Sequence, residues 1–75
     1  MKSMQISLQM ASQVKTFVNL VQNVEYDIDL RSERYIVDAK SLLGIFSLDL
    51  TKPLTVEIHC DKCDDLLEAL KQFAI

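Results

Sequence analysis

Several features that would identify a class of protein at once are missing from this sequence. No run of about 18 apolar residues occurs, so no membrane-spanning helix is predicted. The first residues show no basic segment followed by an apolar one, so we expect no signal peptide. Lys and Arg number 8 against 11 Asp and Glu, and the net charge of -3 argues against nucleic acid and against an anionic membrane as partners.

Residues that carry chemistry are also few. The chain has one histidine, His59, and two cysteines, Cys60 and Cys63. Two cysteines without an export signal are typical of reduced thiols in the cytoplasm. The 75 residues are 49% hydrophobic and 25% charged, which is the composition of a globular chain. We therefore predict a single domain, residues 1–75, with a thin core.

The apolar residues recur with two periods, and each period predicts a kind of secondary structure. Alternation predicts strands at 2–8, 24–31, 35–39 and 54–60. A spacing of three or four predicts helices at 10–21, 42–48 and 66–73. Each strand keeps one polar face, so we expect an antiparallel sheet that helices cover on one side. The fold class is α+β, an open-faced sandwich of four strands in the order βαββαβα.

The same patterns assign individual side chains to the core or to solvent. Met10 begins the apolar stripe of the first helix. In the last strand Cys60 falls on the buried face and His59 on the opposite face, while Cys63 is expected to be half-exposed. Asp61 belongs with the acidic residues that favour the start of the last helix.

The segment HCDKC, residues 59–63, raises the question of metal or redox chemistry. Two thiols and one imidazole are fewer ligands than the four of an ordinary zinc site. A C-x-x-C at a strand–helix junction resembles redox motifs only weakly. The simpler interpretation is a solvent-facing His59 and two thiols that act as small apolar residues. We predict no metal site and no cofactor, and a thiol metal or redox protein stays as an alternative.

The stretch KSLLGIFSLDL, residues 40–50, holds the only glycine, Gly44, inside an apolar run that begins with Ser41. Ser41 stands at the N-cap position of a short helix. The stretch resembles the KSIMGVMSLGI segment of HPr, the histidine-containing phosphocarrier of the bacterial sugar phosphotransferase system. The likeness continues backwards through residues 16–41 and forwards through KPLTVEI and LLEAL. The resemblance implies the βαββαβα sandwich and a protein that is not an enzyme.

The segment that carries phosphate in HPr differs here. HPr proteins have G-[IL]-H-A-R-P before the first helix, and that histidine accepts phosphate from enzyme I. This chain reads SLQMASQVKTF, which places Met10 at the histidine, Ser12 at the arginine and Gln13 at the proline. A thioether does not take a phosphoryl group from a phosphohistidine. The resemblance therefore implies no catalytic residue at this segment.

The short helix keeps two features of the family. Ser41 falls at the serine that a dedicated kinase phosphorylates in HPr of many Gram-positive bacteria, which makes it a candidate regulatory phosphosite as well as an N-cap. Leu43 and Phe46 replace two exposed methionines of the family's docking patch. The predicted partner surface consists of Leu42, Leu43, Gly44, Phe46 and Ser47. The alternative is that the small domain buries these apolar residues.

The resulting hypothesis is an HPr-like regulatory module that binds proteins through residues 41–48 and carries no phosphate on histidine. Its expected partner is an HPr kinase or a transcriptional regulator, and we expect a cytoplasmic monomer or weak dimer. A phosphocarrier with a non-standard acceptor is the main alternative.

Overall fold

The computed structural model describes residues 1–75, and its elements follow the predicted order. The strands are β1 (Lys2–Ile6), β2 (Ile28–Arg31), β3 (Ile36–Asp38) and β4 (Leu54–Ile58). The helices are α1 (Ala11–Val21), α2 (Leu42–Phe46) and α3 (Asp64–Leu70), and a 3-10 turn, η1 (Lys71–Phe73), follows α3. None of these helices has the length and apolar character that crossing a membrane requires.

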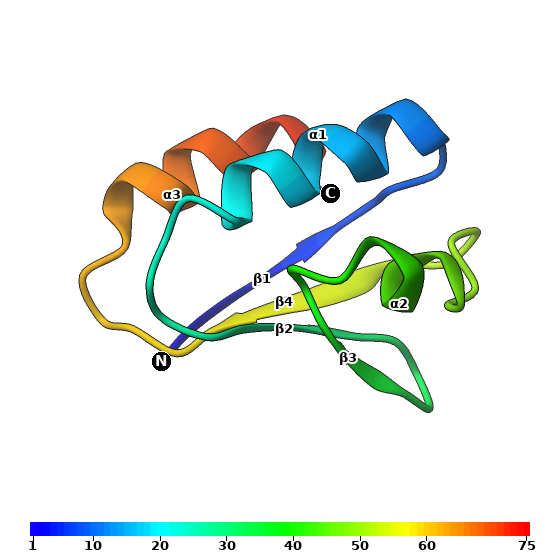
Figure 1. Cartoon of the computed structure of the whole chain (residues 1–75), viewed down its shortest axis with the longest axis horizontal. Helices are drawn as coiled ribbons and strands as arrows, with labels where there is room; N and C mark the ends of the chain where they lie inside the picture. Colours follow the sequence, from blue (N-terminus) through cyan, green and yellow to red (C-terminus); the bar gives the residue numbers. More distant parts are fainter.

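The four strands form one antiparallel sheet in the order β1-β4-β2-β3. Val56, in the middle of β4, pairs with Met4 on one side and with Leu30 on the other. Helices α1 and α3 lie side by side over one face of this sheet, and α2 packs against β3 and α1 (Figure 1). This arrangement confirms the predicted α+β open-faced sandwich.

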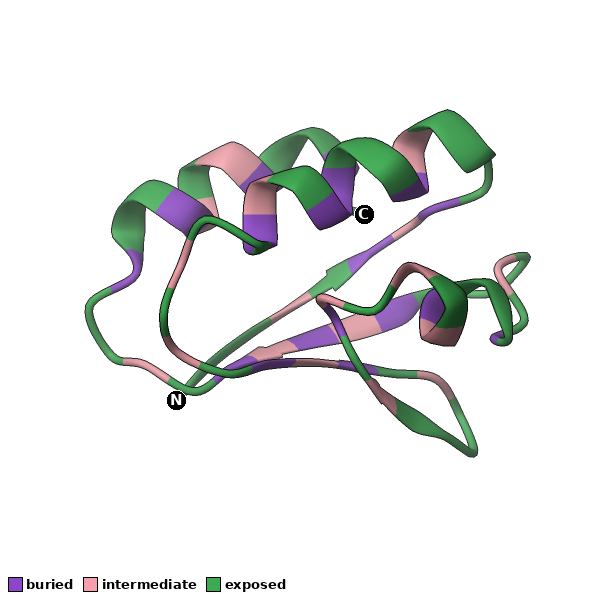
Figure 2. Ribbon diagram, in the orientation of Figure 1, coloured by how far each residue is buried: buried purple, intermediate pink, exposed green.

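The core lies between the sheet and the two long helices, and its 18 buried residues are all apolar or cysteine. Figure 2 shows the buried residues on the inner sides of α1, α3 and the strands. In α1 the inward residues are Val14, Phe17, Val18 and Val21. Phe17 meets Phe73 of η1 edge to face, with 6.0 Å between ring centroids. The helical stripes predicted from residues 14–21 and 66–73 are thus the faces that build the core.

All four strands are shorter than the sequence predicts. The strand expected at 24–31 begins at Ile28, and the strand expected at 54–60 ends at Ile58. These two residues form the last pair of the β2–β4 ladder, and beyond them the His59 N–H still donates to the Asp27 carbonyl at 3.0 Å. Val24 and Tyr26 are consequently half-buried beside the core instead of inside the sheet.

The early end of β4 reverses the prediction for the thiols. Alternation stops at Ile58, so Cys60 is half-exposed, whereas Cys63 is only 3% exposed in the core. The predictions for Met10 and Asp61 are also wrong. Met10 precedes α1 with an extended backbone and is 62% exposed instead of joining the apolar stripe. Asp61 pairs with the amino group of Met1 at 2.5 Å and does not cap α3.

Candidate functional site

The start of α2 is built around the side chain of Ser41. Its backbone is extended (φ -100°, ψ 105°), and its Oγ accepts a hydrogen bond from the Gly44 N–H at 3.1 Å. The Ser41 carbonyl accepts from the Ile45 N–H at 3.0 Å. These bonds confirm the predicted N-cap. The residue is exposed, so its hydroxyl can be reached from solvent.

Lys40 ties this helix start to the turn that follows α1. Its Nζ donates to the carbonyl of Val24 at 2.8 Å, and its own carbonyl accepts from Gln22 Nε2 at 3.3 Å. The Lys40 N–H donates to Asp38 Oδ1 at 2.9 Å. The peptide leading into Ser41 is therefore fixed by bonds to β3 and to the end of α1.

The two sides of α2 differ sharply in exposure. Ile45 is fully buried and Leu42 is half-buried, whereas Leu43 is 84% and Phe46 42% exposed. Residues three apart lie on the same face of a helix, so Leu42 shares the inward face with Ile45, and Leu43 shares the outward face with Phe46. We use the name α2 surface for Leu42, Leu43, Gly44, Phe46 and Ser47. Of these five predicted residues only Leu43, Phe46 and Ser47, the last at the C-cap, are exposed, whereas Leu42 and Gly44 are half-buried.

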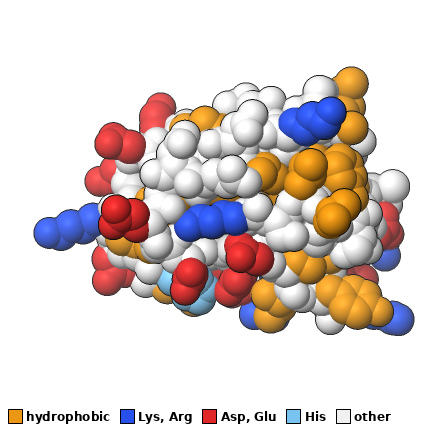
Figure 3. Space-filling model, viewed as in Figure 1, with side chains coloured by type: hydrophobic (Ala, Val, Ile, Leu, Met, Phe, Trp, Pro, Cys, Tyr) orange, Lys and Arg blue, Asp and Glu red, His pale blue; other side chains and the backbone are white.

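The exposed apolar area continues onto β3, which sequence analysis did not predict. Tyr35 and Ile36, at the start of this edge strand, are exposed, and β3 contacts α2. In Figure 3 hydrophobic side chains gather at the end of the molecule where α2 and the β2–β3 hairpin lie. Apolar side chains that cluster in solvent mark interaction sites. These two residues were missed because the sequence does not show that β3 lies at the edge of the sheet, with a neighbouring strand on one side only.

Gly44 permits close packing within the chain itself. A Cβ at this position would lie 3.1 Å from Ser41 Oγ and 3.4 Å from Val37 Cβ. The glycine therefore lets α2 rest on both the Ser41 cap and β3. The sequence motif predicts Gly44 in the partner surface, whereas the contacts that the structure shows at Gly44 are internal ones.

The start of α1 is satisfied by a different set of groups. The Met10 carbonyl accepts from the N–H groups of Gln13 and Val14 at 3.0 and 3.1 Å. Gln13 Oε1 in turn accepts from the N–H groups of Gln9 and Met10 at 3.0 and 3.1 Å. The Met10 side chain makes no capping hydrogen bond and brings no ionisable group to this helix start. Its exposed thioether offers no nitrogen that could carry phosphate.

The single imidazole lies at the other end of the sheet. Met10 follows the Ile6 end of β1, while His59 follows Ile58, which pairs with Lys2 at the opposite end. His59 Nε2 lies 2.8 Å from Asp29 Oδ2, a partner that sequence analysis missed because it is 30 residues away. A hollow of about 370 Å³ beside the imidazole is lined by Asp27, Asp29 and Asp38. These carboxylates repel a phosphoryl group, which is itself anionic.

The thiols offer little chemistry. Neither cysteine forms a disulfide. The pKa of the Cys63 thiol is raised, mainly by burial and then by the neighbouring Cys60 and Asp64. The reactive and metal-binding form is the thiolate, so this environment disfavours it. The structure contains no group of three or more His, Cys, Asp or Glu side chains placed to hold a metal ion.

Comparisons with known proteins identify the family and the fold. A family model described as "PTS HPr component phosphorylation site" matches residues 9–74. The phosphocarrier protein HPr from Bacillus anthracis str. Ames is similar at 27% identity and a TM-score of 0.72, over 99% of this chain and 94% of that one. HPr-C-His from Thermoanaerobacter tengcongensis is similar in fold, with 23% identity and a TM-score of 0.80 over 96% of this chain and 89% of that one. No curated protein matches the chain.

Proposed function

This chain belongs to the HPr family of the phosphotransferase system, in which HPr is a phosphocarrier protein and not an enzyme, and we propose that it acts there as a regulatory protein-binding module. In this proposal it carries no phosphate on histidine and works through the α2 surface. Its partner is an HPr kinase or a transcriptional regulator in the bacterial cytoplasm, and it controls sugar transport or use.

The proposal rests on the start of α1. By the family resemblance this is the place of the phosphate-carrying histidine, and here it holds the exposed thioether of Met10. The only imidazole, His59, lies at the far end of β1 and β4 among carboxylates. Neither position supports ordinary phosphate transfer from enzyme I.

Two features of α2 support the regulatory role. Leu43 and Phe46 expose apolar area that the fold does not use. A phosphate on Ser41 would stay beside the Gly44 N–H. That N–H could still donate a hydrogen bond to the ester oxygen of the phosphoserine. The added charge would then change what the α2 surface binds without unfolding the helix.

Incubation with enzyme I and phosphoenolpyruvate tests the loss of phosphate transfer. We expect no acid-labile phosphate on this protein, because Met10 cannot accept it and carboxylates surround His59. An ordinary HPr in the same tube is the positive control. Stoichiometric acid-labile label, at His59 or elsewhere, would contradict the proposal and favour a phosphocarrier with a non-standard acceptor.

Incubation with an HPr kinase and ATP tests the switch at Ser41. We expect acid-stable label that disappears in Ser41→Ala. Ser47→Ala is the matched control, since Ser47 is the other exposed serine on α2 and its hydroxyl bonds to the Gly44 carbonyl. Label that persists in Ser41→Ala, or no label while ordinary HPr is labelled, would refute Ser41 as the phosphosite.

A further inference from the structure

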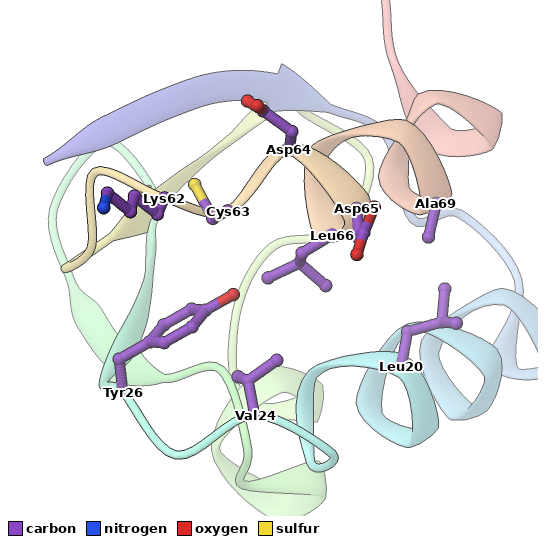
Figure 4. A pocket seen from close by; sticks show the side chains of 9 residues that line it. All are labelled: Leu20, Val24, Tyr26, Lys62, Cys63, Asp64, Asp65, Leu66 and Ala69. Carbon is purple, nitrogen blue, oxygen red and sulfur yellow. The ribbon is translucent and has the colours of Figure 1, made fainter.

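A groove of about 770 Å³ lies away from the α2 surface. It runs between α1, residues 24–26 and the first turns of α3 (Figure 4), and we call it the α1–α3 groove. In Figure 1 the start of α3 and α2 lie at opposite ends of the molecule. Six of the nine lining residues are hydrophobic, so the floor of the groove is apolar. Leu20, Val24, Leu66 and Ala69 form most of this floor.

Two polar side chains turn toward this floor. Figure 4 shows the Tyr26 hydroxyl pointing toward Leu66 and the Asp65 carboxylate on the side of α3 that faces Leu20. Asp64, the preceding residue, points away from the groove, and so does the ammonium of Lys62. Lys62 and Asp64 also line the groove, so one carboxylate and one phenol face its apolar floor, while a second carboxylate and one ammonium lie at its rim.

The carboxylate at the groove has no cationic partner in the chain. The four ion pairs of the structure and the His59–Asp29 contact use other acidic residues, and Asp65 belongs to none of them. Burial and then the nearby Cys63, Cys60 and Asp65 raise the pKa of Tyr26, so the phenol stays protonated near neutral pH and its O–H can donate. The charged residues that line the groove are Lys62, Asp64 and Asp65, so their net charge is -1, which favours a cation.

We propose that the α1–α3 groove binds an arginine or lysine side chain presented by a basic segment of a partner protein. Long cationic side chains lay their alkyl stems on apolar surface and keep the charged head at its edge. Here the stem would cover Leu20 and Ala69, and the head would meet the Asp65 carboxylate and the Tyr26 oxygen. The net charge of -3 would also steer a basic segment toward the chain. This surface is separate from Ser41 and goes beyond the proposed function.

The first test is a heteronuclear NMR titration of the whole chain with the capped pentapeptide Ala-Leu-Arg-Leu-Ala. We expect the amide signals of Tyr26, Leu66 and Ala69 to shift, with a Kd on the order of 1 mM. The same peptide with citrulline in place of arginine keeps the shape and loses the charge, and it should bind about fivefold more weakly. Absence of shifts at these residues up to about 10 mM peptide would overturn the proposal.

A pair of variants separates the groove from the general negative field. Asp65→Asn should weaken binding of the arginine peptide about fivefold, and Asp64→Asn less than about twofold. Both changes remove one charge from the first turn of α3, so their effects on net charge and on the helix dipole are matched. Equal losses in the two variants would mean that the field of the whole chain attracts the peptide, and would overturn the groove.

Two further measurements show whether the groove binds a small cation or a second copy of the chain instead of a segment of a partner protein. Spermidine that shifts the same signals as strongly as the peptide would identify a small cation and overturn a protein segment. Shifts of these signals with protein concentration, in the absence of peptide, would identify a second copy of the chain and also overturn it. Leu43→Ala, on the α2 surface, should leave peptide binding unchanged, and a loss there would contradict a separate site.

Discussion

The first backbone N–H groups of a helix need hydrogen-bond acceptors from outside the helix, and α1 and α2 obtain them from different groups. At α2 the side chain of Ser41 accepts the Gly44 N–H, so the capping atom is an exposed hydroxyl. At α1 the cap residue Met10 contributes only its backbone, and the amide of Gln13 satisfies the N–H groups before the helix. A helix start can thus be fully formed with or without a side-chain hydroxyl as its capping group. Capping and chemistry are therefore separate properties of the two sites.

The surroundings of the two helix starts also differ in the apolar side chains and charged groups that they contain. The start of α2 is tied through Lys40 to the end of α1 and is followed at once by the exposed Leu43 and Phe46. A charge added at Ser41 would lie beside these apolar side chains, where it can alter a contact. The start of α1 has a single large exposed apolar residue, Met10, and no nucleophilic nitrogen. The contrast favours regulation at α2 over transfer at α1.

The largest effect is expected when α1 is given the missing groups. Met10→His combined with Ser12→Arg supplies the imidazole and the guanidinium that the family resemblance implies. We expect enzyme I to label this variant at least about tenfold more slowly than an ordinary HPr, because a small misplacement of a reacting group is costly. The bonds from Gln13 to the Gln9 and Met10 N–H groups hold the present backbone in place. Labelling at the rate of ordinary HPr would show that the two side chains were all that was missing.

The next contrast lies within α2, between its buried and exposed sides. Ile45→Ala should lower the free energy of unfolding by about 2–4 kcal/mol, because a fully buried side chain is lost. Leu43→Ala should cost less than about 0.5 kcal/mol, since Leu43 is 84% exposed. Urea unfolding measures both, and binding to the kinase should fall only for Leu43→Ala at equal folded fractions. A cost at Leu43 as large as at Ile45 would make it a core residue and end its role in docking.

Sequence patterns predicted the order of elements and the class of fold because both depend on local periodicity. The inward residues of α1 and the Ser41 cap follow directly from spacing along one helix. The ends of the strands do not follow from local spacing, because they depend on pairing between distant segments. The last pair of the β2–β4 ladder joins Ile28 to Ile58. The exchange of Cys60 and Cys63 between surface and core is a consequence of that one non-local pairing.

The site was predictable to a similar degree. The five residues of the α2 surface fall within one motif at 42–47, so the sequence alone puts them on one element, and their role in binding stays a prediction. The contact between His59 and Asp29 and the bond from Lys40 to Val24 join residues far apart in the chain. The α1–α3 groove likewise needs three separate segments. None of these leaves a periodic signal in the sequence.

The two caps themselves can be compared by removing each one. Ser41→Ala should cost about 1 kcal/mol of stability, the usual value of an N-cap hydroxyl. Gln13→Ala should cost about 0.5 kcal/mol, because the freed N–H groups of the exposed Gln9 and Met10 can bond to water. Thermal unfolding of both variants checks the order. A larger loss for Gln13→Ala would mean that α1 depends on its cap more than α2 does.

The smallest expected effect is that of Gly44→Ala, which combines two opposing terms. Alanine improves helix propensity by up to about 1 kcal/mol. The new Cβ would lie 3.1 Å from Ser41 Oγ, which is closer than ordinary contact and would disturb the cap. We expect the free energy of unfolding to stay within about 0.5 kcal/mol of the wild type.

A double-mutant cycle shows whether the glycine and the cap are coupled. In Ser41→Ala the oxygen is absent, and the remaining neighbours, the Cβ atoms of residue 41 and of Val37, lie at an ordinary 3.4 Å. Gly44→Ala in that background should therefore stabilise the protein by about 0.5–1 kcal/mol, although it changes the wild type little. Such non-additivity would show that Gly44 is present so that the Ser41 hydroxyl can cap α2. Additive effects would mean that the hydroxyl does not limit residue 44, and that the start of α2 tolerates a side chain there as freely as any other helix position.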